Sequence, residues 1–398
     1  MLAHAPAGSR AGVAAVALAV AAAQGAALLL RPREGLIAPA PVRAEEHFSA
    51  DELERARAYR RGQRRLALAA MGVEGGLLAA LAARPPRRLA RARPATAGAA
   101  LSVAMALAPL PVRAAARRRA IEVGLVTQSW LGWAGDLAKS GAIGAAVAAG
   151  GAALGDALRR RAPRAWWLPG AGVVVAATGA VVFAAPVLLD PLFNRFRPLP
   201  EGPLRRDILE LAERAGVRVG EVYVVDASRR TTAANAYVTG LGATKRVVLF
   251  DTLLEHFTPD ETRLVVAHEL AHVRFRDVHR GLAFTALVAP FGAFAVAVLA
   301  PRRSGAAALP GLALAAGAVS APVGVVANAL SRRVEARADA FSLRLTEAPE
   351  PFVSFERRIT VRNVADPDPP RLLHALFGTH PSTVERIGIA RAYASGRG

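Results

Sequence analysis

The chain has 398 residues, 53% of them hydrophobic, and its mean hydropathy is +0.29. This composition excludes an ordinary soluble domain, and arginines interrupt the apolar residues too often for a single buried core. The net charge is +20. Because the basic residues cluster in short loops without stacking aromatics, we expect them to contact anionic lipid headgroups of the bilayer, and we expect no nucleic acid partner. The absence of cysteine excludes disulfides and thiolate ligands, so any metal must be held by His, Asp or Glu.

Seven apolar runs are long enough, at 1.5 Å per helical residue, to cross or nearly cross a hydrocarbon core of about 30 Å. They cover residues 11–30, 66–83, 96–112, 137–155, 166–189, 281–300 and 308–330. The first run could instead be a cleavable signal sequence, but its twenty apolar residues favour a retained span. We therefore expect a mainly α, polytopic membrane protein with about seven transmembrane helices.

Two polar blocks interrupt the membrane pattern and divide the chain into four regions. Spans one to five and their loops fill residues 1–189, and a first polar block follows at 190–280. Spans six and seven occupy 281–330, and a second polar block covers 331–398. We expect the two polar blocks to form one catalytic unit.

The arginine distribution bears on orientation in the membrane. Loops 31–65 and 113–136 lie on the same side as the block 190–280 and are basic, which the positive-inside rule associates with the cytoplasm. Loop 84–95 lies on the opposite side and carries five arginines, so this loop by itself favours the reverse orientation. We expect a multi-pass protein of a bacterial cell membrane with the block 190–280 on the cytoplasmic side.

The first polar block carries patterns of a small α/β unit. "PLRRDILELAERAG" (203–216) places its apolar residues on one face and ends at Gly216, so it predicts an amphipathic helix. "EVYVVDA" (221–227) and "KRVVLFD" (245–251) are short runs rich in β-branched residues, which predict strands of a small sheet.

A candidate zinc motif follows. "TPDETRLVVAHELAHVRFRDVH" predicts a helix with a capping box, because Thr258 can cap it and Glu261 comes three residues later. His268 and His272 lie four residues apart on that helix, so both imidazoles project from one face and can bind one ion. Glu269 is rotated by about 100° from His268 and can reach a water on that ion without ligating it. The alternative is a helix whose histidines are only hydrogen-bonded.

A catalytic zinc site needs a third protein ligand and an open position for water. "SRRVEARADAFSLRL" (331–345), which we expect to form a second helix after the last span, offers Glu335 and Asp339 four residues apart. Glu335 is the leading candidate for the third ligand, and Asp339 can accept the free ring N–H of a ligating histidine. The alternative for this pair is an ordinary solvated helix face among neighbouring arginines.

These residues resemble those of the type 1 CAAX prenyl endopeptidases, which are integral-membrane zinc metallopeptidases of the gluzincin class. The stretches that carry the similarity are "NAYVTGLGATKRVVLFDTLL" (235–254), "VVAHELAHVRFRD" (265–277), "SRRVEARADAFSLRL" (331–345) and "THPSTVERI" (379–387), with weaker similarity at 48–62 and 124–141. Seven spans with the catalytic block between the fifth and the sixth is also the layout of that family. Ala271 departs from the family, which usually has glycine there, but alanine is small and a better helix former, so we expect little effect.

The resemblance implies a zincin-like metalloprotease domain with one Zn²⁺ per chain. His268, His272 and Glu335 would hold the zinc, and Glu269 would activate a water. We therefore expect a membrane-embedded zinc metalloendopeptidase acting on a peptide or membrane-protein substrate, lipidated or not. The alternatives are a general quality-control protease for membrane proteins and a non-catalytic membrane scaffold with a relict motif.

The resemblance also implies roles for three residues outside the zinc ligands. Asn235 and the catalytic His380 would hydrogen-bond the substrate backbone near the scissile peptide, and Arg386 would lie around the substrate's C-terminal end. "NAYVTG" reads independently as an edge strand that can add an extended peptide to the sheet. His380 precedes Pro381, so we expect it in a loop rather than inside a helix.

Overall fold

The computed structural model describes residues 7–239 and 245–396. In this part of the chain six helices are long and apolar enough to cross a membrane, and a bent helix pair makes up a seventh candidate span. The elements that contain the six are α1 (Ala7–Leu30), α2 (Ala50–Ala83), α6 (Trp130–Arg161), α7 (Trp167–Ala184), α12 (Asp277–Leu299) and α13 (Leu309–Thr346). The prediction of a mainly α, polytopic membrane protein is confirmed.

The bent pair and the fifth span both owe their irregularity to proline. Helices α4 (Pro94–Leu107) and α5 (Leu110–Glu122) meet at 43°, and Pro109 lies at the break. Helix α7 continues through the π-helical turn η2 (Ala185–Leu189), which contains Pro186, into the short helix α8 (Asp190–Phe193). A proline has no N–H for the helical hydrogen bond, so a continuous α-helix is interrupted at both positions.

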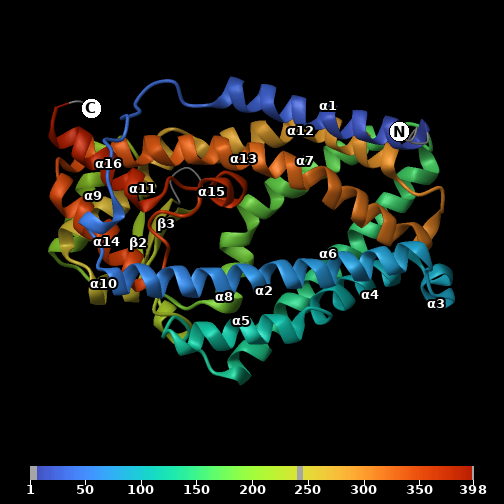
Figure 1. Cartoon of the computed structure of the whole chain (residues 1–398), viewed down its shortest axis with the longest axis horizontal. Coiled ribbons are helices and arrows are strands. Elements are labelled where there is room, and N and C mark those ends of the chain that lie inside the picture. Colours follow the sequence, from blue (N-terminus) through green and yellow to red (C-terminus); the bar gives the residue numbers. More distant parts are fainter. Residues whose placement is uncertain (1–6, 240–244, 397–398) are drawn as a thin grey trace.

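Helix α13 differs from the expected arrangement. The stretch 331–345 is not a separate helix after the last span, because α13 runs without a break for 38 residues, from Leu309 to Thr346. No glycine or proline occurs between Gly324 and the helix end, so nothing stops the helix where the sequence becomes charged. One continuous helix, with Pro322 inside it, therefore joins the membrane part to the second polar block (Figure 1).

The first polar block contains a four-stranded sheet with the order β1-β2-β4-β3. The strands are β1 (Phe196–Pro198), β2 (Glu221–Val225), β3 (Ala236–Thr239) and β4 (Arg246–Phe250), and only β2 and β4 pair in parallel. The predicted strands are present, and β3 lies at an edge of the sheet as expected. The amphipathic helix α9 (Pro203–Arg214) buries Ile208 and Leu211 in the core formed with Val247 and Leu249.

Helix α11 (Pro259–Arg274) begins with the predicted capping box, in which the Thr258 hydroxyl accepts from the Glu261 N–H and the Glu261 carboxylate accepts from the Thr258 N–H. It packs against β3, α9, α13 and α14 (Pro349–Arg362). The remaining short elements are η1 (Ala44–Glu46), α3 (Arg87–Arg91), η3 (Ala227–Arg229), α10 (Asp251–His256), η5 (Gly305–Ala308), α15 (Arg371–Phe377) and α16 (Thr383–Ala394).

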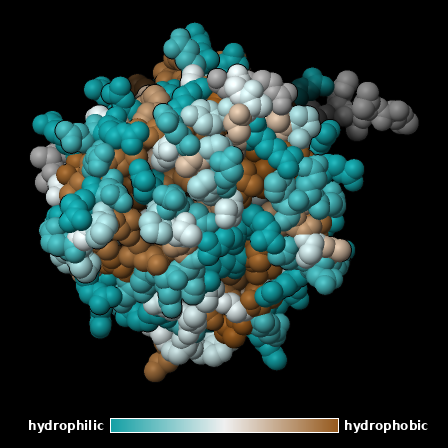
Figure 2. Space-filling model, turned by 90° about the vertical axis from the view of Figure 1, so that its left-hand side faces the viewer, coloured by the Kyte–Doolittle hydropathy of each residue, from teal (hydrophilic) through white to brown (hydrophobic). Residues whose placement is uncertain are grey.

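Hydrophilic surface and exposed apolar surface lie in different parts of the molecule. The sheet, α9, α10, α11, α14 and α16 gather at one end, and the long helices extend from there to the opposite end, where α3 lies (Figure 1). Figure 2 shows that the first of these ends is mostly hydrophilic. By contrast, large apolar side chains such as Val13, Leu68 and Val147 are exposed on the long helices. The exposed apolar surface of the spanning helices suits a lipid surrounding.

The cap of α11 can be tested by mutation. Thr258→Ala removes the hydroxyl that accepts from the Glu261 N–H and is expected to cost about 1 kcal/mol of stability. The measurement is the thermal unfolding midpoint of the purified protein in detergent. Thr258→Ser keeps the hydroxyl and should stay close to the parent; an equal loss in both variants would show that the cap is not responsible.

Candidate metal centre

Three side-chain atoms from α11 and α13 converge on one point. His268 Nε2 lies 3.3 Å from His272 Nε2 and 3.1 Å from Glu335 Oε2, and His272 Nε2 lies 3.7 Å from the same oxygen. Four ligands at zinc distances of about 2.0 to 2.2 Å in a tetrahedron are separated by about 3.3 to 3.6 Å. The three atoms therefore have nearly the spacing of three corners of a zinc tetrahedron.

The charges around these atoms also fit a cation. His268 and Glu335 are buried, and Asp339, 2.9 Å from the other ring nitrogen of His268, has no exposed surface. Burial alone would lower the pKa of His268, but its hydrogen bonds with Asp339 and Glu335 reverse this and raise it to about 10. A site that draws a proton this strongly onto a buried imidazole is one where a metal cation would be stabilised, so the donor set fits a divalent metal such as zinc.

Each histidine is oriented by a carboxylate behind it. With Nε2 facing the ligand cluster, the His268 ring donates its Nδ1 proton to Asp339 Oδ1 over 2.9 Å, and His272 donates to Asp277 Oδ2 over 3.1 Å. Such contacts fix the tautomer and make the imidazole a stronger ligand. Asp339 was expected here from the sequence. Asp277 was not, although an acid five residues after the second histidine was visible in the motif itself.

The position of Asp277 results from the end of α11. Arg276 has a left-handed backbone (φ 55°), and this turn lets α12 begin at Asp277 with the aspartate beside His272. The buried Arg337 of α13 donates a hydrogen bond to Asp277, and Arg280 Nε lies 3.3 Å from it. Two arginines therefore compensate the charge of this carboxylate.

Glu269 lies beside the ligand cluster between two cavities. One of its carboxylate oxygens lies within 4.8 Å of a ring nitrogen of His268 and of a ring nitrogen of His272. Burial raises the pKa of Glu269, so its carboxylate accepts a proton more readily than an exposed glutamate. It lines a small cavity of about 120 Å³ on one side and a larger one of about 530 Å³ on the other. A substrate entering either cavity would meet this carboxylate.

The sequence-predicted substrate residues Asn235 and His380 border the smaller cavity. His380 lies in the loop between α15 and α16, as expected, and its Nε2 is 3.3 Å from Glu335 Oε2. Asn235 directly precedes the edge strand β3, and its backbone carbonyl accepts a hydrogen bond from the Phe250 N–H. The structure thus brings both residues to the side of the ligand cluster where Glu269 is accessible.

Arg386 lines the same cavity but makes buried contacts. Its Nε and Nη2 donate to Asp339 at 2.9 and 2.6 Å, and its Nη1 lies 2.7 Å from Glu356 Oε1. Its guanidinium therefore braces the carboxylate that orients His268. Burial raises the pKa of Glu356 to about 7 despite the nearby arginine. Sequence reasoning missed Glu356, because a glutamate on α14 shows its partner only after the chain folds.

Comparisons with known proteins find similarity to metalloproteases. Residues 198–394 match the family model described as peptidase family M48. The chain is 37% identical to the uncharacterized metalloprotease YhfN of Bacillus subtilis over 243 residues, which are 58% of this chain and 57% of that protein. It is 42% identical to CAAX prenyl protease 1 of Saccharomyces cerevisiae over 110 residues, which are 25% of this chain and 24% of that protein.

A solved structure has the same fold. The crystal structure of S. mikatae Ste24p superposes with a TM-score of 0.73 over 96% of this chain and 99% of that chain, at 19% sequence identity. The chain spans 57% of the length of the Bacillus relative and 24% of the yeast one, so the matches are confined to part of each.

The carboxylate behind His272 provides a test of the metal centre. Asp277→Asn leaves the shape of the side chain but weakens the hydrogen bond that orients His272, so metal affinity is expected to fall about 10- to 100-fold. The measurement is zinc retention by the purified protein against a competing chelator. Asp260→Asn is the control, because Asp260 is on the same helix and, among the described residues, its side chain makes an exposed ion pair with Arg263 and no contact with the centre. Equal retention in all three proteins would remove Asp277 from the centre.

Proposed function

We propose that this chain, which belongs to peptidase family M48 together with the CAAX prenyl proteases, is a membrane zinc metalloendopeptidase. The observation that carries the proposal is the convergence of His268 Nε2, His272 Nε2 and Glu335 Oε2 within 3.7 Å. Two imidazoles and one carboxylate would supply three protein ligands to a bound ion, the number found in catalytic zinc sites, which also bind a water. The carboxylates behind both histidines support a ligating role for each.

Glu269 and His380 have different roles in the proposed peptide hydrolysis. A bound zinc ion would lower the pKa of a water molecule and polarise the peptide carbonyl. Glu269 takes the proton of that water as general base and passes it to the leaving amine, a role suited to a carboxylate whose pKa burial has raised. His380, which is half-exposed beside Glu335, donates a hydrogen bond where negative charge develops on the carbonyl oxygen.

The substrate is held as an extended strand. β3 pairs only with β4 in the described sheet, so its other edge is available for backbone hydrogen bonds to a peptide. Asn235 lies at the start of this strand and borders the cavity with Glu269, which places its amide within the same region as the base. An extended peptide along β3 would therefore pass the ligand cluster.

The larger cavity supports a membrane-associated substrate. It is lined by Glu269 and His272 of the candidate centre and also by Val182 and Phe183 of the spanning helix α7. We infer that peptides with an apolar anchor, including a prenylated C-terminus of the CAAX type, reach the base through this cavity. We place the centre on the cytoplasmic side, supported by the basic loops 31–65 and 113–136. Quality control of membrane proteins is the alternative substrate class.

The proposed roles of Glu269 as general base and of Glu335 as zinc ligand can be tested separately. Glu269→Gln should keep zinc bound and lower peptide cleavage by about 10² to 10⁴, whereas Glu335→Ala should lower the zinc content because a ligand is lost. Cleavage of a quenched fluorescent peptide and metal analysis of the purified proteins are the two measurements. The exposed Glu255→Gln serves as the control for lost charge. Normal turnover in Glu269→Gln, or full zinc content in Glu335→Ala, would overturn the corresponding role.

The substrate class is addressed by proteomics. Cells carrying the parent chain or Glu269→Gln are compared for uncleaved membrane peptides. A prenyl-peptide processing enzyme should leave a few lipidated C-terminal peptides uncut in the variant. A quality-control protease should instead leave many unrelated membrane proteins stabilised, and that outcome contradicts the prenyl assignment.

A further inference from the structure

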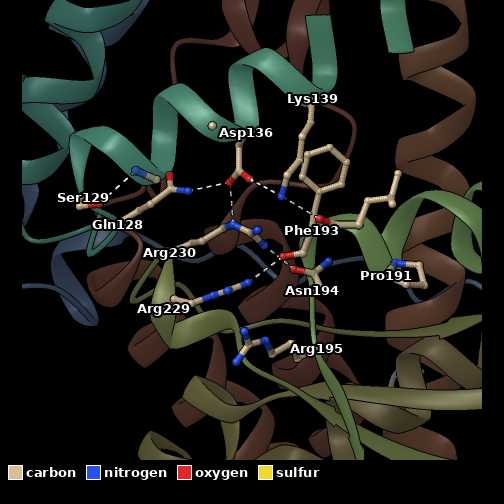
Figure 3. A pocket seen from close by; sticks show the side chains of 13 residues that line it. Gln128, Ser129, Asp136, Lys139, Pro191, Phe193, Asn194, Arg195, Arg229 and Arg230 are labelled. Atoms are coloured by element: carbon tan, nitrogen blue, oxygen red, sulfur yellow. Dashed lines mark hydrogen bonds and ion pairs between the residues drawn. The ribbon is translucent and has the colours of Figure 1, made fainter. Parts of the chain in front are cut away.

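A third cavity lies away from the candidate centre, where two spanning helices meet the sheet. Its volume is about 480 Å³, and it is bordered by the first turns of α6, by α8 with the segment that leads into β1, and by η3. Figure 3 shows the polar side chains around it. It includes residues of the stretch 124–141, which the zinc chemistry does not use.

The lining of this cavity has an excess of positive charge. Lys139, Arg195, Arg229 and Arg230 contribute four cations, and Asp136 contributes one carboxylate. That carboxylate is already used, because its Oδ2 accepts from Arg230 at 2.9 Å and from Gln128 at 2.6 Å. Asp226, outside the lining, lies 3.4 Å from Arg229. Two carboxylates therefore face four cations, and the charge that remains is positive.

Several cationic donors have capacity for a ligand. Arg229 and Lys139 each bind one backbone carbonyl, those of Phe193 and Leu192, and both side chains are about half-exposed. The guanidinium of Arg195 makes no hydrogen bond or ion pair with the residues that the structure describes. Its backbone N–H, in contrast, is held by Asp226 at 2.8 Å. The main chain of Arg195 is fixed, while its charged group is left for a partner.

Aromatic residues place this cavity at a membrane boundary. The candidate spans that border it run over Trp130–Arg161 and Trp167–Phe193, so the cavity lies where one begins and the other ends. The four tryptophans of the sequence lie at the ends of these two spans, as Trp130 with Trp133 and Trp166 with Trp167. Tryptophans at both ends of spans mark the two headgroup levels of a bilayer. Next to the cavity, Leu131 is 83% exposed.

We propose that this cavity binds the phosphate of an anionic phospholipid headgroup. Basic pockets between transmembrane helices at the membrane surface suit such headgroups, and arginines bind phosphate through charge-assisted hydrogen bonds. Exposed apolar side chains beside the cavity, such as Leu131 and Leu192, provide a surface for the acyl chains. A bound headgroup would neutralise the excess charge and join α6 and α8 to η3 and β1. This proposal is independent of the peptidase chemistry.

The test is a titration of the purified full chain in a neutral detergent, with binding measured by isothermal titration calorimetry. The probes are dihexanoyl-phosphatidylglycerol, dihexanoyl-phosphatidylcholine and inorganic phosphate. We expect saturable binding of the phosphatidylglycerol and binding of the phosphatidylcholine at least about tenfold weaker. Inorganic phosphate should compete only weakly, because it lacks the acyl chains. Equal binding of both lipids, no saturable binding, or tight binding of phosphate alone would overturn the assignment.

Variants locate the binding in the cavity. Arg195→Gln is expected to weaken phosphatidylglycerol binding about tenfold, since one charge-assisted contact is lost. Arg197→Gln is the matched control: it removes the same charge from an exposed residue of β1 that does not line the cavity. Its affinity should stay within about twofold of the parent. An equal loss in both variants would mean attraction to the basic surface in general and would contradict a defined site.

A pair of substitutions on another element tests the same site and controls for misfolding. Gly135 of α6 lines the cavity, and a Cβ there would meet no atom within 4 Å. Gly135→Glu should place a carboxylate among the cations and abolish phosphatidylglycerol binding, whereas Gly135→Ala should retain it. Thermal unfolding midpoints of both variants close to that of the parent establish that the fold is intact. Unchanged binding in Gly135→Glu would count against the site.

Discussion

The buried carboxylate of Asp339 is the constraint around which the candidate centre is arranged. Asp339 has no exposed surface, and a charge in such a place is costly unless hydrogen bonds and opposite charges compensate it. The compensation comes from His268 and from two nitrogens of Arg386, which itself faces Glu356. These four side chains belong to α13, α11, α16 and α14. Satisfying one buried charge therefore fixes four helices around the ligand cluster.

The same arrangement occurs twice, once behind each histidine. Asp339 orients His268 and is held by Arg386, and Asp277 orients His272 and is held by Arg337. In each case an arginine neutralises the carboxylate, so the carboxylate need not withdraw the proton from the imidazole. A metal that displaces the Nε2 proton would then find each histidine as a neutral ligand whose Nδ1 proton stays on the ring.

The sequence predicted what depends on local spacing. The i, i+4 spacing of one helix predicts that His268 and His272 share a face, and the residue types at Thr258 and Glu261 predict the cap at the start of the same helix. Asp277 and Glu356 could not be predicted in this way, because the contact of one depends on a left-handed residue at Arg276 and that of the other on packing of α14 against α16. The continuity of α13 is not visible in the composition, because the change from apolar to charged residues near position 331 is typical of the end of a span but does not end a helix.

The unbroken α13 bears on the depth of the centre in the membrane. Glu335 follows Leu309, the first residue of α13, by 26 positions, or about 39 Å at 1.5 Å per residue. Asp277 begins α12, which has 23 residues and extends about 34 Å to Leu299. A hydrocarbon core is about 30 Å thick. From Glu335 along α13 and from Asp277 along α12, the helices are thus each long enough to cross the core. This length supports the proposal that the cluster lies at the headgroup level, where the apolar anchor of a proposed substrate would stay in the bilayer while its peptide reaches Glu269.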